Sequence, residues 1–446
     1  MAQLKALPTE LVIAILEEAQ YEDLLPRYKW LKRYSRVCRA WRAPAQRLLF
    51  SHVALLRGAA QCKAFKDAVT DLSSADPAHL DYLRESVKTL AMAVDHQEVY
   101  AEVIELCPNL RELHLSLYHA SFRPDVLARL ARGPRVEAIR VKAYHLWPLL
   151  QLLSVYGTVQ YLEIDFNSVR DGFAEAQDLP TPLTQLRELR YFDQLHRTHP
   201  LVEWILSGPS QKTLEVLELR CPGIELEMLA GVGPHLRSLA IAGLGGNDDV
   251  AEVAPALEEL VVLASFPVTV SLVKRFPASL VHLAIQDLTL NGRCVEDVDA
   301  LAAYYVNGGL SLRVLSFHCR RGEPEKAARS DALAMFELCK ARGIEFRFFE
   351  PPYGHYAWEV RAALNIYTMM FSWLFFLQRV PLESVRTFPR PTPFSERRAG
   401  SMSGEQLSAE WDLSRARGKS SFVRRVAKAA GKAFGSSIPP MALAKP

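Results

Sequence analysis

A short apolar pattern that recurs along most of the chain constrains its fold more than any other feature. The pattern has apolar residues at its first, fourth and sixth positions, and between residues 87 and 280 its copies start 21 to 28 residues apart. The copies are Phe50–Val53–Leu55, Val87–Leu90–Met92, Leu110–Leu113–Leu115, Val136–Ile139–Val141, Val159–Leu162–Ile164, Leu186–Leu189–Tyr191, Leu214–Leu217–Leu219, Leu236–Leu239–Ile241, Leu257–Leu260–Val262, Leu280–Leu283–Ile285, Leu312–Leu315–Phe317 and a degenerate copy from Ile344 to Phe349.

Each copy predicts one short strand, and the segment after it predicts a helix. The fourth and sixth positions point the same way, because side chains alternate between the two faces of a strand. The segments between copies have helical spacing, for example Val99, Val103 and Cys107. One strand and one helix cannot bury their apolar faces alone, so neighbouring units must stack. A doubly wound α/β fold is the alternative, but the repeated register and the lack of a Gly-rich phosphate loop favour a stacked array.

The pattern resembles that of leucine-rich repeats over residues 50–350, about two-thirds of the chain. The Asn or Cys that this family carries after the last Leu is mostly missing, although Asn167 lies at the expected offset and Cys221 one residue early. The resemblance implies an α/β solenoid of horseshoe shape, whose sheet lines an exposed concave face.

The residues that alternate with the buried ones would form this concave face. They are charged in the first half of the array and apolar in the second, which predicts that the face selects a protein target by charge and by an apolar patch. The candidate target-binding residues are Arg140, Lys142, Glu163, Asp165, Arg190, Glu218, Arg220, Val261 and Leu263. Their three arginines could also pair with a phosphate group on the target. Alternatively, residues 351–380 fold back and cover the apolar part.

The N-terminal 49 residues have a different pattern. Pro8 suits the first turn of a helix, and Leu11 and Ile15 continue an apolar stripe after it. A second helical pattern runs from Trp30 to Trp41, and eight Lys or Arg residues with no acid among them lie between residues 27 and 47. A module of this size cannot bury a large core alone. It must therefore pack against the rest of the chain or against another protein.

The module resembles an F-box in three short motifs: Leu-Pro-x-Glu-Leu from residue 7, Ile-Leu at residue 15 and Val-Cys-Arg-x-Trp-Arg from residue 37. The resemblance implies docking on the Skp-type adaptor of a cullin–RING ubiquitin ligase. Two departures are the long connection from Gln20 to Trp30 and Pro44, which should interrupt or restart the last helix. The alternative is that the module only caps the solenoid. The implied adaptor-binding residues are Leu7, Pro8, Leu11, Ile15, Val37, Cys38 and Trp41.

The repeat pattern stops after Glu350. Residues 351–380 predict a C-terminal cap helix, whose apolar stretch of about sixteen residues, 362–377, is shorter than the roughly twenty that span a bilayer. Residues 381–446 predict a disordered basic tail, in which 421–434 could form a basic amphipathic helix. A repeat protein held at a membrane by these two segments is a further alternative. The main prediction does not include membrane binding.

Composition excludes several classes of function. A net charge of +3 does not favour nucleic-acid binding, and seven scattered cysteines without a C-x-x-C pair favour a reducing compartment, cytoplasmic or nuclear. The chain lacks G-x-S-x-G, Walker and H-E-x-x-H motifs. We therefore expect no cofactor, no metal site and no catalysis. The sequence predicts a substrate-recognition subunit of a ubiquitin ligase that binds the adaptor, through it the cullin, and an unknown protein target.

Overall fold

The repeat array is one long sheet. The computed structural model describes residues 8–19, 21–22, 25–26, 28–71, 77–166, 182–193, 199–221, 225–242, 244, 248–264, 269–287, 312–318, 336–349 and 402–403. In the sheet that these residues form, strands β3 to β14 follow one another in chain order, and all their pairings are parallel. A doubly wound sheet reverses its strand order, so this alternative is excluded. The prediction of a leucine-rich-repeat solenoid after an N-terminal helical module is confirmed.

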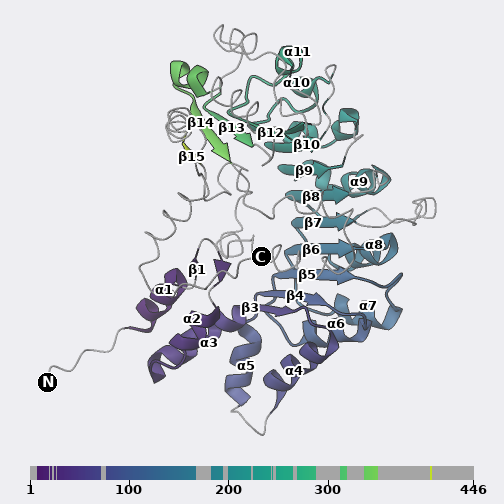
Figure 1. The fold of residues 1–446 in the computed structure, drawn as a ribbon. Helices are drawn as coiled ribbons and strands as arrows, with labels where there is room; N and C mark the ends of the chain where they lie inside the picture. The colour runs from purple at the N-terminus through teal and green to yellow at the C-terminus, as the bar shows by residue number, and fades with distance from the viewer. Residues whose placement is uncertain are drawn as a thin grey trace, which may run out of the picture.

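Every predicted copy of the apolar pattern falls on a strand. The strands are β3 (His52–Leu55), β4 (Thr89–Ala93), β5 (Glu112–Leu117), β6 (Ala138–Ala143), β7 (Tyr161–Phe166), β8 (Glu188–Asp193), β9 (Val216–Arg220), β10 (Ser238–Ala242), β11 (Glu259–Ala264), β12 (His282–Asp287), β13 (Val314–His318) and β14 (Glu345–Phe349). The sheet curves, and the helices between the strands lie on its outer side (Figure 1). We call the other side of the sheet the inner face.

The connecting helices differ in length along the array. The longer ones are α4 (Ala59–Thr70), α5 (Pro77–Ser86), α6 (Gln97–Glu105), α7 (Pro124–Ala131), α8 (Leu146–Val155) and α9 (His199–Leu206). Between β9 and β12 the connections hold only single turns, such as η3 (Leu226–Leu229), α10 (Val250–Val253) and α11 (Val270–Val273), and residues 336–342 before β14 are helical again. The helices and the core-facing strand positions share one hydrophobic core, which extends from Leu55 to Phe346.

A repeated backbone contact sets the register between units. The carbonyl of Lys88 accepts hydrogen bonds from the amides of both Arg111 and Glu112, at 2.9 and 3.0 Å. A carbonyl oxygen has two lone pairs, so it can hold two donors at once. The same contact recurs at the second position of the following units, with the carbonyls of Arg111, Glu137, Gln160, Arg187, Glu215, Arg237, Glu258 and Val281 as acceptors.

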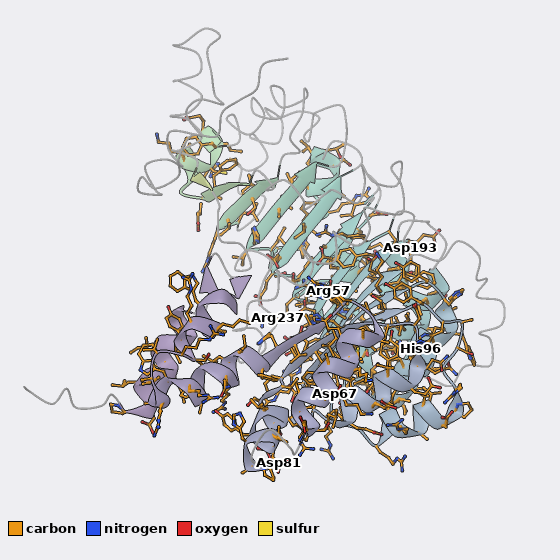
Figure 2. All side chains as sticks on the ribbon, turned by 60° about the horizontal axis from the view of Figure 1, so that its bottom comes forward. Arg57, Asp67, Asp81, His96, Asp193 and Arg237 are labelled. Carbon is orange, nitrogen blue, oxygen red and sulfur yellow. The ribbon has the colours of Figure 1, made fainter. Side chains whose placement is uncertain are left out.

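The N-terminal module has a small core of its own. It consists of α1 (Thr9–Ala19), the short strands β1 (Tyr21–Glu22) and β2 (Leu25–Pro26), α2 (Tyr28–Tyr34) and α3 (Arg39–Ser51). Val12, Leu16, Leu31, Ala45 and Leu48 form its buried core, which is separate from the core of the array. Figure 1 shows the module at one end of the sheet, and Figure 2 shows it from a second direction, where Asp67 and Asp81 mark α4 and α5.

Helix α3 joins the module to the array without a linker. It ends at Ser51 and β3 begins at His52, while α3 also packs against α5. The expectation that Pro44 interrupts this helix is wrong, because α3 continues through it. Pro44 is buried near the start of the helix, where it removes one backbone hydrogen bond, and the packing of Ala45 and Leu48 offsets this loss.

The C-terminal predictions fall almost wholly outside the described residues. This holds for the cap helix over 351–380, its apolar segment 362–377 and most of the tail 381–446. Two tail residues are an exception to the expected disorder, since Met402 and Ser403 form β15, which pairs antiparallel with Arg347 and Phe348 of β14. An open edge strand presents unpaired backbone groups, which accounts for this addition.

Candidate interaction surfaces

The module exposes large aliphatic side chains around its small core. Val37 is 62% exposed, Leu11 51% and Ile15 43%. Leu11 and Ile15 are four residues apart and therefore share one face of α1, next to the buried Val12 and Leu16. The apolar stripe of α1 is thus only partly buried within this chain. Scattered exposed aliphatic residues are common on proteins, but three on a module of this size mark a candidate binding surface.

The other predicted adaptor-binding residues divide between exposed and packed positions. Pro8 and Cys38 are exposed. Trp41 is half-buried and packs against the module core, with its ring 5.9 Å from that of Tyr34. Leu7 lies outside the described residues. The resemblance thus includes one residue, Trp41, that supports the module from within, and several that face outward.

The inner face of the array carries a ladder of alternating charges. The strand register aligns Arg140, Glu163, Arg190 and Glu218 on β6 to β9. Arg140 lies 3.0 Å from Glu163, and Arg190 lies 3.9 Å from Glu163 and 3.7 Å from Glu218. Opposite charges directly across neighbouring strands stabilise a sheet. The candidate target-binding charges therefore neutralise one another.

Arg190 lies at the centre of this ladder. Burial alone would lower its pKa, but the carboxylates of Glu188, Glu218 and Glu163 outweigh that effect, so the pKa of Arg190 is raised on balance. Its Nε atom also donates a hydrogen bond of 2.6 Å to Glu188. The guanidinium is therefore held as a cation among three carboxylates.

The remaining charged candidates are engaged in a second row. Lys142 lies 3.9 Å from Asp165, and the guanidinium of Arg220 lies 5.2 Å from the ring centre of Phe192. Arg220 also pairs with Glu218 at 2.6 Å. Each of the three arginines proposed for phosphate thus already faces a carboxylate within the protein. The expected free charged floor is wrong for Lys142 and Glu218, which are buried.

The expected apolar patch in the second half of the inner face is also corrected. Val261 is 0% exposed, and the strand register places it between Ala240 and Ala284, which are buried as well. A side chain without accessible surface cannot contact a partner in this conformation. The side chain of Leu263 lies outside the described residues.

A polar cluster on β4 and β5 was not predicted from the sequence. Glu112, His114, Ser116 and Thr89 are buried, and His114 Nε2 lies 2.6 Å from Glu112 Oε1. Thr89 Oγ1, Glu112 Oε2, His114 Nδ1 and Ser116 Oγ have no hydrogen-bond partner among the described residues. A buried polar atom without a partner costs about 1–3 kcal/mol, so four on one face indicate a place for added donors and acceptors. The sequence signal that could have identified these residues is the alternation of polar and apolar residues along β5.

A second polar network crosses β10 to β13. Ser238 Oγ donates a 2.6 Å hydrogen bond to Glu259 Oε2, whose Oε1 lies 2.6 Å from His282 Nδ1. The other ring nitrogen, Nε2, lies 2.7 Å from Ser316 Oγ. This connectivity is that of a nucleophilic triad. However, Ser316 is 1% exposed, so no substrate reaches its hydroxyl in this conformation, and the network ties neighbouring strands together.

In the part of the chain that the structure describes, no group of three or more His, Cys, Asp or Glu residues is placed to hold a metal ion. None of the described helices is long and apolar enough to cross a membrane.

Comparisons with known proteins add little to this geometry. No family model matches the chain, and no curated protein matches it. The solved structures that resemble it include the crystal structure of the Rad7 and Elc1 complex in yeast, with a TM-score of 0.38 and 15% identity over 75% of this chain and 85% of that chain. At this TM-score and identity, the likeness establishes neither a shared family nor a shared function.

Proposed function

We propose that this protein is the substrate-recognition subunit of a cullin–RING ubiquitin ligase. Its N-terminal module, an F-box by resemblance, docks on a Skp-type adaptor and through it on the cullin. Leu11, Ile15 and Val37 provide apolar contacts with the adaptor, Pro8 and Cys38 lie at its edge, and Trp41 supports them from the module core. The protein has no catalytic residues of its own and works in the cytoplasm or the nucleus.

The observation that carries the proposal is the exposure of Leu11, Ile15 and Val37 on a module with its own core. A module that served only as a cap would bury its apolar face against the repeats. Here Leu11, Ile15 and Val37 stay exposed beside that core, and the adaptor would cover them.

The inner face of the array is the proposed target-binding surface. Asp165 and Arg190 keep the largest exposed side-chain fractions among the paired charges of the ladder. The polar atoms without partners on β4 and β5 lie on the same face. Because α3 runs directly into β3, a bound target is held at a fixed distance from the docked ligase, and this proximity supports ubiquitin transfer.

Co-purification of the full chain with a Skp-type adaptor tests the proposal. The double variant Leu11→Asp/Val37→Asp should weaken adaptor binding by at least about 100-fold, because it places charges in a buried apolar contact. Trp147 and Leu183 are equally exposed apolar residues on the array. The matched control Trp147→Asp/Leu183→Asp should bind the adaptor as the wild type does. Wild-type protein that fails to bind would refute the function.

A scaffold whose N-terminal helices only cap the solenoid is the second candidate. It is favoured by the packing of α3 on α5 and by the contact of Phe50 with the array core. Deleting residues 1–48 does not separate the two candidates cleanly, because it cuts α3. Surface substitutions do separate them: for a pure cap, Leu11→Asp/Val37→Asp leaves every interaction of the folded protein unchanged.

A further inference from the structure

A hollow of about 600 Å³ lies between the end of α2 and the start of α3. Arg39, Arg42 and Gln46 line it from α3, and their spacing of three and four residues places them on one helix face. Ser35, Arg36 and Cys38 complete the lining from the turn before α3. The hollow therefore brings together three arginines within residues 36–42.

These arginines are uncompensated within the described part of the chain. Arg36, Arg39 and Arg42 are exposed, and no ion pair joins any of them to a described carboxylate. Like charges three residues apart on a helix repel each other. On the array, by contrast, the exposed Arg237 pairs with Glu258 at 2.8 Å and Arg129 pairs with Glu105 at 2.6 Å. The array compensates these cations with its own acids, whereas no described acid of the module pairs with Arg36, Arg39 or Arg42.

The start of α3 adds to the positive potential of the hollow. Its first turn holds no acidic residue, and the N-cap Cys38 makes no side-chain hydrogen bond to the helix amides. A helix N-terminus carries a partial positive charge, which disfavours cations nearby and favours anions. Arg39 and Arg42 are repelled by this partial charge and by each other in the free protein. A bound anionic group would attract all of these positive charges and so offset the repulsion.

The hollow adjoins one of the exposed apolar residues of the module. Val37 lies in sequence between Arg36 and Cys38, which both line the hollow. An apolar contact with a charged rim is the usual anatomy of a protein interface, and the charges at the rim set the association rate and the choice of partner.

We propose that this hollow receives an acidic segment, rich in Asp and Glu side chains, of the same adaptor that covers the apolar residues. The inference rests on the proposed function and names the chemistry of that partner. Carboxylates of the segment pair with the guanidinium groups of Arg36, Arg39 and Arg42, which accept bidentate contacts. The long-range attraction steers the two proteins together before the apolar contacts form.

Association kinetics of the full chain with the purified adaptor test this inference. At about 50 mM salt, the triple variant Arg36→Gln/Arg39→Gln/Arg42→Gln should associate about tenfold more slowly than the wild type, and at about 500 mM salt the two should converge. The matched control Arg135→Gln/Lys212→Gln/Arg313→Gln removes three exposed charges from the array. It should stay within about twofold of the wild type. Because the replaced side chains are exposed, every variant should stay folded, and the Arg triple variant should melt at or slightly above the wild-type temperature.

Alkylation of Cys38 gives an independent readout of position. This thiol lines the hollow and is exposed, so the adaptor should slow its reaction with iodoacetamide when the complex forms. If the wild type binds the adaptor but the Arg triple variant keeps its rate and salt dependence, the hollow is not the acidic site, while the proposed function stands. A wild type that does not bind the adaptor overturns both. If the Arg triple variant instead loses binding to vesicles with anionic lipids but binds the adaptor as the wild type does, the hollow is a membrane contact. That result would also overturn the inference.

Discussion

Arg190 of the repeat array and Arg39 of the N-terminal module are the same type of residue in opposite surroundings. Arg190 lies among Glu163, Glu188 and Glu218 on the inner face of the sheet. Arg39 lines an open hollow and has no ion pair within the described residues. The apolar residues differ in the same way, since the array buries Val261 completely, whereas the module leaves Val37 more than half exposed.

This contrast indicates where the molecule needs a partner. The array pairs most of its inner-face charges and buries most of its apolar side chains by stacking its units. The module keeps apolar surface and positive charge that nothing in the described chain compensates. The difference follows from size, because a short three-helix module offers too few facing surfaces to bury all its stripes.

The largest expected effect compares these two arginines directly. Arg190→Met should lower the free energy of unfolding by about 3 kcal/mol, because Glu188 loses its guanidinium partner and Glu163 and Glu218 keep only Arg140 and Arg220. Arg39→Met should change it by less than about 0.5 kcal/mol. Urea unfolding of both variants measures the difference. Equal effects would show that the ladder is not a stabilising feature.

Cysteine reactivity provides the second test. Burial raises the pKa of Cys62 to about 11 and that of Cys107 to about 12, whereas Cys38 is exposed. At neutral pH the buried thiols should therefore react with iodoacetamide at least about 100-fold more slowly than Cys38. Peptide mass spectrometry of the labelled native protein measures each site. Rapid labelling of Cys107 would show that the array opens more readily than its packing indicates.

Two tyrosines offer a smaller, matched comparison. The hydroxyl of Tyr100 donates to the carbonyl of Val94 at 2.9 Å and also lies against the carbonyl of Ser116, which links two units of the array. Tyr100→Phe should destabilise the protein by about 1–3 kcal/mol. Tyr34→Phe in the module, where the ring packs on Trp30 and Trp41, should have little effect. Thermal unfolding of the two variants decides whether the hydroxyl of Tyr100 is needed.

The smallest expected effect depends on pH. Burial alone would raise the pKa of Glu112, but the charges of His114, Arg140 and His52 outweigh it and lower the pKa below its usual 4.5. A lowered pKa stabilises the fold above the unfolded-state value, and this stabilisation is lost as the pH falls through the folded-state value.

Glu112→Gln should therefore lose less stability than the wild type between pH 5 and pH 3. Urea unfolding across this range measures the slope, and the substitution Glu225→Gln at an exposed position serves as control. A wild-type slope no steeper than that of Glu112→Gln would contradict the expected direction.

Much of the array was predictable because its signal is periodic. All twelve strands fall on predicted copies of the apolar pattern, since a strand that buries one face must repeat its apolar residues at every second position. Leu11, Ile15 and Val37, three of the residues that the resemblance implied for adaptor binding, are exposed, whereas Trp41 is half-buried. The adaptor and target contacts assigned to these residues stay predictions.

The neighbours across strands were not predictable from one unit at a time. The sequence placed Arg140, Glu163 and Arg190 on one face, but their pairing depends on a register that only the stacked backbone sets. The same holds for Glu259, His282 and Ser316, which come together from three strands. Close packing between units could not be predicted from the sequence either. At Gly233, for example, a Cβ atom would lie 2.1 Å from the carbonyl oxygen of Val253.

The sequence alone therefore determined which elements form and which face of each is apolar, because both depend on local periodicity. The tertiary structure decided which charges meet and which remain without a partner, because that depends on residues far apart in the chain. This is why the inner face, expected to be a free charged floor, is a largely paired ladder. It is also why Arg36, Arg39 and Arg42, which α3 and the turn before it bring together around the hollow, meet no described carboxylate.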